Sequence, residues 1–309
     1  MLTAEQIAAR TRYIGASDAP GVLGLSRWDT PLRVWAEKTG TLPLEQDENI
    51  AAEAGDALEP LVIRLFERKT GKKVERVSET LTHPNYEFIK ANLDGVISAE
   101  DAVFEAKTAS AYKADEWDGE DVPNEYVLQV QHQLAVTGKS HGYIAVLIGN
   151  HDFRWKRIDR DNGLIKEMIA REVDFWVRFV ETNTPPRVVH RQDTDTLSAL
   201  YPNGSELTEV ALPADAEGIA SSIKGLQKDA DILLGAIERE KNKLRLALGD
   251  TAVGIAGKWR VTWKNQTTER LDLERLKAEA PEVYAKFLKA TPSRVLRITE
   301  IKAPKEPKK

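Results

Sequence analysis

The stretch FIKANLDGVISAEDAVFEAKTA, residues 88–109, constrains the fold of this chain more than any other. It contains two apolar runs, 88–97 and 102–109, which are separated by a short polar segment. Two such runs joined in this way predict an antiparallel hairpin. Side chains of a strand alternate between two faces, so the acid Glu105 and the amine Lys107 lie on the same face.

The hairpin also brings a second acid toward the first. If the turn is centred in the middle of the polar segment, Asp94 faces Glu105 and Asn92 faces Lys107. Opposed Cβ atoms lie roughly 5 Å apart, and two carboxylates at that distance repel unless a cation lies between them. The alternative is that Asp94 belongs to an ordinary Asp-Gly turn and that Glu105 and Lys107 lie on a solvated strand face.

A divalent metal ion is the cation that this geometry favours. Mg²⁺ takes oxygen ligands, commonly one or two protein carboxylates together with water and substrate phosphate. Lys107 would then hold or help to deprotonate an attacking water, or neutralise charge on a phosphate. The chain has no cysteine and its five histidines show no zinc-binding spacing, so any metal would have oxygen ligands.

Composition limits the class of protein. The chain has 309 residues, 41% of them hydrophobic and 30% charged, which suits one large or two smaller folded domains. A net charge of −5 gives no global attraction to nucleic acid, but it is compatible with an enzyme that has a local basic channel. We expect a cytoplasmic protein without a membrane span, because no apolar run is long enough to span and no signal sequence is evident.

Hydrophobic periodicity predicts an α+β protein whose main domain comprises residues 1–184, with an apolar strand over 141–149 at the centre of its sheet. Residues 185–213 are expected to form a mostly irregular linker. Residues 214–302 would form a helical and β extension, and residues 303–309 a disordered basic tail.

Within the extension, near-heptad apolar spacing predicts a long helix over residues 215–248, which would pack on its own core or on another subunit. The segment AVGIAGKWRVTWKN predicts a hairpin with Trp259 and Trp263 on one face. Packing in a core and stacking on nucleic-acid bases are both open for these tryptophans. A helix over 272–290 and a strand over 293–301 complete the region.

A candidate anion site precedes the hairpin. Ser17 is placed to cap a helix over 18–24. Its hydroxyl, the exposed N–H groups of that helix and Arg10 or Arg12 would together bind a phosphate. The alternative is a simple helix cap with surface arginines.

Two longer helices add further candidates. Glu59, on a helix over 49–70, lies next to the apolar stripe, which favours either an inward acid with a metal or lysine partner or an acid solvated at the edge. On a helix over 124–137, Gln129 lies beside the apolar face, whereas Gln131 points about 200° away from it, given 100° per residue. Gln129 is therefore the candidate for an inward contact.

The order and spacing of these segments resemble a known family. RTRYIGASDAP, GDALEP, NLDG, FEAKT and YVLQVQHQLAVTG follow one another as in the YqaJ-like viral recombinases, which include phage alkaline exonucleases of the lambda-exonuclease type within the PD-(D/E)xK nuclease superfamily. The resemblance covers residues 8–182. It implies a restriction-endonuclease-like core, in which a central mixed β-sheet is flanked by helices.

The resemblance implies a role for each acid and amine. Asp94, Glu105 and the backbone carbonyl of Ala106 would bind Mg²⁺, with Mn²⁺ as a substitute, and Lys107 would lie at the attacking water. Glu59 matches a helix glutamate that helps to hold a second metal ion.

Other residues match positions that contact DNA. Arg10 and Ser17, seven residues apart, match residues that hold the 5′-phosphate of a DNA end, with Arg12 as an alternative to Arg10. Gln129 matches the glutamine of the helix beyond the active-site strand. Asn92 stands where several relatives have a serine or another small residue, a departure that affects phosphate contacts rather than metal binding.

The implied activity is that of an Mg²⁺-dependent 5′-to-3′ exonuclease on linear double-stranded DNA, which leaves a 3′ single-stranded tail for recombination. The resemblance also implies a ring-shaped homotrimer around DNA and a single-strand annealing protein as partner. It further implies a phage- or prophage-encoded protein in the cytoplasm of a bacterial host. The alternatives are another PD-(D/E)xK endonuclease or repair nuclease, and a DNA-binding recombination module without catalysis.

Overall fold

The computed structural model describes four stretches of the chain, which are residues 9–42, 50–204, 209–289 and 294–300. The chain divides into two compact units, Met1–Pro202 and Asn203–Lys309. The basic tail expected over 303–309 lies outside the described residues. In the described stretches, no helix is long and apolar enough to cross a membrane.

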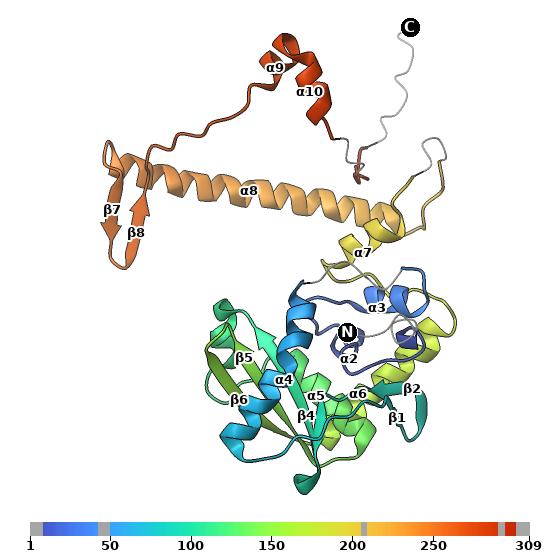
Figure 1. Ribbon diagram of the computed structural model, residues 1–309. Helices are drawn as coiled ribbons and strands as arrows, with labels where there is room; N and C mark the ends of the chain where they lie inside the picture. Colours follow the sequence, from blue (N-terminus) through green and yellow to red (C-terminus); the bar gives the residue numbers. More distant parts are fainter. Residues whose placement is uncertain (1–8, 43–49, 205–208, 290–293, 301–309) are drawn as a thin grey trace. The chain divides into compact units, whose positions relative to one another are not determined.

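The first unit is an α+β fold built on a four-stranded mixed sheet (Figure 1). The strands have the spatial order β3 (Gly95–Ile97), β4 (Ala102–Ala109), β5 (His141–Ile148) and β6 (Asp152–Asp159). β4 and β5 are parallel, and the two outer pairs are antiparallel. β5 is buried along its whole length, which confirms the prediction of a central strand covered on both faces.

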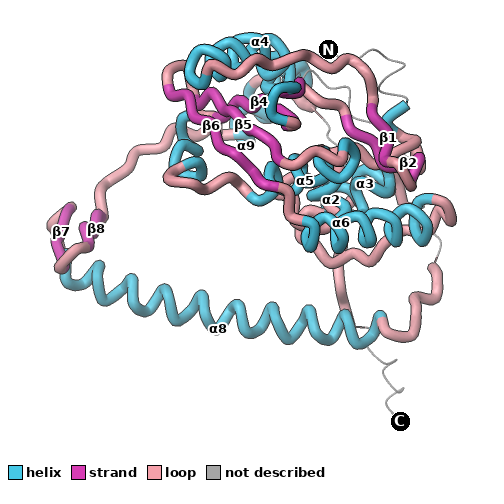
Figure 2. The backbone as a smooth tube through the Cα atoms, turned by 90° about the horizontal axis from the view of Figure 1, so that it is seen from below, coloured by secondary structure: helices cyan, strands magenta, loops and turns pink. Residues whose placement is uncertain are grey.

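Helices cover both faces of this sheet (Figures 1 and 2). α4 (Ile50–Thr70) packs on one face, where the ring of Phe66 contacts that of Phe104 on β4. α5 (Asn124–Thr137) and α6 (Asn162–Phe175) share a buried cluster with the other face. The predicted α+β core with a mixed sheet between helices is therefore confirmed.

The predicted hairpin is present at β3 and β4, in the predicted register. Gly95 pairs with Phe104, so Asp94 and Glu105 are the next opposed residues beyond the last pair. The turn contains a 3-10 helix over Ser98–Glu100. The alternation of β4 also follows the prediction, because neighbouring residues of the strand join the two clusters on opposite faces of the sheet.

The first apolar run, 88–97, is wrong as a single strand. A break that begins at Asn92 separates β3 from β2 (Tyr86–Ala91), and β2 pairs with β1 (Leu81–His83) and with the segment that precedes α2. These partners take the backbone N–H and C=O groups of β2, so the run cannot continue along β4. Asn92 therefore does not face Lys107 across a ladder, and the predicted opposition begins only at Asp94.

The N-terminal part of the unit forms a separate buried cluster around α2 (Ala19–Val22) and α3 (Pro31–Lys38). α2 has a single turn, and Asp18 rather than Ser17 stands at its N-cap, so the predicted capping role of Ser17 is wrong. The hydroxyl of Ser17 instead accepts a hydrogen bond from the guanidinium of Arg10 (2.8 Å).

Shorter helical segments complete the first unit. They are a 3-10 segment Ala111–Trp117 after β4, a π-helical turn Trp176–Val180 after α6, and α7 (Asp193–Leu200). α7 falls within the stretch expected to be a mostly irregular linker. Its Leu197 and Leu200 pack against the buried cluster around α3, so this part of the chain belongs to the first unit.

The second unit contains the long helix that the near-heptad spacing predicted, α8 (Ala216–Leu248). The predicted hairpin follows it, formed by β7 (Val253–Ala256) and β8 (Trp259–Thr262). Trp259 and Trp263 are 67% and 52% exposed, so of the two open alternatives the structure does not have core packing.

The C-terminal elements differ from the prediction. The helix expected over 272–290 is two helices, α9 (Leu273–Glu279) and α10 (Pro281–Phe287), because Pro281 has no N–H with which to continue the first. The strand expected over 293–301 does not occur in its described part, residues 294–300.

Candidate active site

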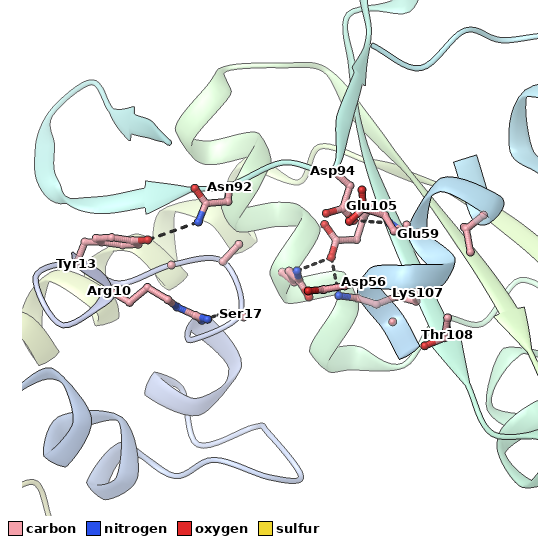
Figure 3. A pocket seen from close by; sticks show the side chains of 16 residues that line it. Arg10, Tyr13, Ser17, Asp56, Glu59, Asn92, Asp94, Glu105, Lys107 and Thr108 are labelled. Atoms are coloured by element: carbon pink, nitrogen blue, oxygen red, sulfur yellow. Dashed lines mark hydrogen bonds and ion pairs between the residues drawn. The ribbon is translucent and has the colours of Figure 1, made fainter. Parts of the chain in front are cut away.

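Residues from five separated segments of the first unit line one cavity of about 360 Å³ (Figure 3). All the predicted site residues except Arg12 belong to this lining: Arg10, Ser17, Glu59, Asn92, Asp94, Glu105, Ala106, Lys107 and Gln129. Arg12 lines a neighbouring cavity instead. The fold thus brings together candidates that lie far apart in the sequence.

The cavity lies against an open edge of β4. β3 pairs with β4 only as far as Phe104, whereas β4 runs on to Ala109. In this unpaired part, the N–H of Ala106 donates a hydrogen bond to Oδ2 of Asp94 (2.7 Å). The N–H and C=O of one strand residue point to the same side of the strand. The carbonyl of Ala106 therefore points toward Asp94 as well, which fits its predicted use as a ligand.

Glu105 lies at the centre of a hydrogen-bond network. It is only 3% exposed and accepts bonds from Lys107 Nζ (2.5 Å), Gln129 Nε2 (2.5 Å) and Gln133 Nε2 (2.6 Å). Gln131 points elsewhere, to a main-chain carbonyl of β6 (2.7 Å). The predicted inward contact of Gln129 is present. Gln133 was missed, although its i+4 spacing from Gln129 places both amides on the same side of α5.

Charges at the site are closely coupled. Burial and the nearby charge of Glu105 raise the pKa of Asp94 well above its ordinary value, although the Ala106 N–H and Lys107 oppose this. Burial works to lower the pKa of Lys107, but the charge and hydrogen bond of Glu105 outweigh it and raise that pKa. Lys107 is therefore held as an ammonium, which suits charge neutralisation better than proton abstraction.

The donor set fits a divalent cation. Two carboxylates that repel each other, the half-buried Asp94 and the buried Glu105, lie beside a carbonyl oxygen, and a bound cation would relieve the repulsion. In the part of the chain that the structure describes, no group of three or more acidic or histidine side chains could hold a metal ion. One or two carboxylates, with water and phosphate as further ligands, are the usual protein contribution to Mg²⁺ binding.

The partner of Glu59 in the structure differs from the predicted one. It extends from α4 into the cavity lining and is partly buried, but its carboxylate forms an ion pair with the guanidinium of Arg76. A metal or a lysine was the expected partner. The role of Glu59 in holding a second metal ion stays a prediction, since the arginine that pairs with it is 61% exposed.

The other end of the cavity holds the candidate anion site (Figure 3). Arg10 and Ser17 point toward each other there, and a carboxylate oxygen of Asp18 lies 3.8 Å from the guanidinium of Arg10. Lys38 pairs with Asp18 at 2.5 Å. Burial raises the pKa of Asp18, but the charges of Lys38 and Arg10 outweigh it and lower that pKa. Lys38 therefore neutralises much of the charge of Asp18. The positive charge of Arg10 is left to attract a phosphate.

α5 also connects the site to the core through a histidine. His132 is fully buried, with Nδ1 2.9 Å from Oε1 of Glu172 on α6 and Nε2 2.9 Å from the carbonyl oxygen of Lys90 on β2. Both ring nitrogens therefore have partners, and the side chain fixes α5 against its neighbours. His132 does not line the active-site cavity.

An α+β core with two carboxylates and a lysine at one strand edge, and a candidate anion site at the other end of the same cavity, is typical of a nuclease. Comparison with solved structures supports this class. The fold resembles an alkaline exonuclease (LHK-Exo) from Laribacter hongkongensis, with a TM-score of 0.51 and 23% identity over 59% of this chain and 94% of that chain. A structure of LHK-Exo in complex with dAMP gives a TM-score of 0.51 and 25% identity over the same shares.

Sequence comparison identifies the family to which the chain belongs. Residues 6–140 match the YqaJ-like viral recombinase domain. The chain is also 36% identical over 301 residues to the uncharacterized protein YqaJ of Bacillus subtilis (strain 168), covering 96% of this chain and 94% of that protein. The chain belongs to the YqaJ-like viral recombinase family, as its sequence predicted. The expectation of a deoxyribonuclease is supported by this family and by the exonuclease neighbours, and nucleases of this kind generally use a divalent metal.

Proposed function

We propose that the chain is an Mg²⁺-dependent exonuclease that digests linear double-stranded DNA from its 5′ ends and leaves 3′ single-stranded tails for recombination. The observation that carries this proposal is the shared cavity. It combines an acid pair and an amine, suited to phosphodiester hydrolysis, with a separate arginine and hydroxyl, suited to a terminal phosphate.

Each residue around the acid pair has its own role. Asp94, Glu105 and the Ala106 carbonyl would hold the cation, which when bound supplies a more acidic water and a positive charge at the phosphate. Lys107, already protonated beside Glu105, neutralises charge that develops on the phosphate oxygens. Gln129 donates to the same carboxylate oxygen of Glu105 as Lys107 and helps to hold that carboxylate in place.

The terminal phosphate accounts for the end specificity. Arg10 and Ser17 would bind a 5′-phosphate through charge-assisted hydrogen bonds, at a fixed separation from the acid pair. A strand without an end cannot place a terminal phosphate there, and therefore closed circular DNA should resist digestion. A homotrimer around DNA and a single-strand annealing partner stay predictions from the family resemblance.

One set of reactions tests the proposal. The full chain is incubated with 5′-phosphorylated linear, 5′-hydroxyl linear and closed circular duplexes, each with Mg²⁺ or with a chelator. We expect digestion of the phosphorylated linear DNA in Mg²⁺ alone, slower digestion of the 5′-hydroxyl DNA, and an intact circle. In Arg10→Ala, the rates on the two linear substrates should converge, because the group that distinguishes them is gone.

Two variants address the alternatives. Glu105→Ala should abolish digestion, and if it cuts as fast as the parent chain the assignment of the acid pair is wrong. Lys107→Ala should bind DNA but turn it over at least about 100-fold more slowly, as for the loss of one transition-state donor. Digestion of the circle would indicate an endonuclease. Metal-independent binding without turnover in the parent chain would indicate a DNA-binding module.

A further inference from the structure

An acid lies next to the candidate phosphate site. Asp18 follows Ser17 in the chain, and its Oδ1 lies 3.8 Å from Nη2 of Arg10. A carboxylate in this position competes with a phosphate for the same guanidinium, because both are anions that accept hydrogen bonds from its N–H groups. A site that binds a phosphate therefore needs a reason to keep this acid and a means to limit the competition.

The reason to keep the acid lies in the loop that carries Ser17. Oδ2 of Asp18 accepts a hydrogen bond from the N–H of Gly15 (2.8 Å), which fixes the loop between these two residues. Gly15, Ala16 and Ser17 line the active-site cavity, whereas Asp18 does not. Asp18 therefore holds in place the loop that presents the serine hydroxyl, without lining the cavity itself.

Lys38 limits the competition. It is the last residue of α3, and its side chain is only 1% exposed. Its Nζ donates to Oδ2 of Asp18 (2.5 Å) and to the main-chain carbonyl oxygen of Arg10 (2.8 Å). A buried ammonium is costly to a fold unless it is paired, and Asp18 is the carboxylate that pairs with it. Lys38 does not line the active-site cavity.

The two cations share the acid unequally. Asp18 is closer to the ammonium of Lys38 than to the guanidinium of Arg10, which donates instead to the hydroxyl of Ser17. Of these two cations, which both pair with Asp18 in the described structure, only Arg10 would be left if the ammonium were removed. The carboxylate would then occupy the charge of Arg10, and a terminal phosphate would meet an acid that no other cation neutralises.

We propose that Lys38 determines the preference of the chain for 5′-phosphorylated DNA ends, because its ammonium neutralises Asp18 and leaves Arg10 to the phosphate. This role rests on the proposed function, in which Arg10 and Ser17 hold that phosphate. Lys38 is a positioning residue, since it acts through Asp18 and Arg10 and does not touch the substrate.

The test compares two ends in one protein. The substrates are linear duplexes of one sequence with the far end blocked, one with a 5′-phosphate and one with a 5′-hydroxyl, in an alkaline buffer that favours ionised Asp18. Lys38→Met should lower the ratio of the initial rates, phosphate over hydroxyl, by about tenfold, because like charges then meet at the phosphate site. The double variant Lys38→Met with Asp18→Asn removes the competing charge and keeps an acceptor for Gly15. It should restore the ratio to within about twofold of the parent value.

The ratio is insensitive to a partial loss of folding. Both rates come from one protein sample, so a smaller folded fraction lowers them equally. Lys38→Gln is a milder second variant, because its amide can still donate a hydrogen bond while it carries no charge, and it should also lower the ratio. Lys166→Met, which removes an exposed amine on α6, is the matched control and should leave the ratio unchanged. In a chelator, fluorescence anisotropy of the two duplexes should show the same pattern in binding, without catalysis.

Each other outcome overturns the inference. An unchanged ratio, with or without an equal fall in both rates, would make Lys38 a residue that supports only the fold. A lower ratio that Asp18→Asn does not restore would assign the effect to the lost hydrogen bond with the Arg10 carbonyl and not to charge. If the parent chain digests both ends at the same rate, the proposed site for the terminal phosphate itself fails. That result differs from a parent that prefers the phosphate and variants that keep the preference.

Discussion

Replacement of Gln133 should lower activity while it leaves the free energy of unfolding nearly unchanged. Its side chain is fully buried, Nε2 donates to Oε2 of Glu105 (2.6 Å), and in the described structure its Oε1 has no hydrogen-bond partner. Gln133→Leu removes a favourable bond and an unfavourable unpaired acceptor together, with little change in volume. The two effects on the free energy of unfolding therefore oppose each other.

The two opposing contributions to the free energy of unfolding are similar in size. A hydrogen bond to a charged group contributes about 1.5–3 kcal/mol, and a buried unpaired polar atom costs about 1–3 kcal/mol. The free energy of unfolding of Gln133→Leu should thus lie within about 1 kcal/mol of the parent value. Activity should nevertheless fall roughly 10- to 100-fold, the usual effect of losing an outer hydrogen bond to a metal-ligating group.

Gln131→Leu is the matched control on the same helix. Gln131 is equally buried, but both ends of its amide are paired, with the carbonyl of Asp159 (2.7 Å) and the N–H of Asp161 (3.0 Å). Its loss leaves two main-chain groups without partners and should cost about 2 kcal/mol, with activity per folded molecule unchanged.

Urea unfolding followed by circular dichroism measures the stabilities, and initial rates of nucleotide release across a range of Mg²⁺ concentrations measure activity. The reasoning is refuted if Gln133→Leu loses several kcal/mol and keeps its rate. That result would make Gln133 a core residue whose contact with Glu105 has no bearing on the reaction.

Two further predictions concern the parts that support the site. Burial lowers the pKa of His132, but the charge and hydrogen bond of Glu172 outweigh it and raise that pKa above 6.5. The stability this pair contributes is then complete below pH 6.5 and is lost as pH rises through the raised pKa. The melting temperature should therefore fall over that window, less steeply in Glu172→Gln; equal slopes would contradict this. A Cβ at Gly95 would overlap the side chain of Val74 and lie 2.9 Å from the carbonyl oxygen of Glu75. Gly95→Ala should thus lower stability by about 1–3 kcal/mol and slow digestion by displacing the adjacent acid, and an unchanged melting curve would show that the backbone yields without cost.

The acid pair was predictable because its determinants are local. Alternation along β4 and a short polar turn are sufficient to set the register that brings Asp94 next to Glu105, and the structure has that register. The hydrogen bond between Asp94 and the Ala106 N–H was not predictable, because it requires β3 to begin only at Gly95. That end is set by contacts of β2 with segments distant in the sequence.

Competition between partners explains the other differences. Serine is a common N-cap residue, but the neighbouring Asp18 stands at the N-cap position, and the hydroxyl of Ser17 accepts a hydrogen bond from Arg10. Glu59 lies at the predicted place on α4, yet Arg76, from a segment without a strong sequence signal, reaches it. Sequence spacing fixed which faces these residues occupy, whereas the choice among nearby partners depends on the three-dimensional fold.

The open edge of β4 has a consequence for solubility. A strand edge with unpaired N–H and C=O groups is a site at which another chain can add a strand. Here the half-buried Asp94, the buried Glu105 and the protonated, partly exposed Lys107 lie at that edge. An incoming strand would have to bury these charges without compensation, so the groups proposed to cut DNA also keep neighbouring molecules apart. Variants that neutralise them should be examined for self-association before a loss of activity is attributed to chemistry.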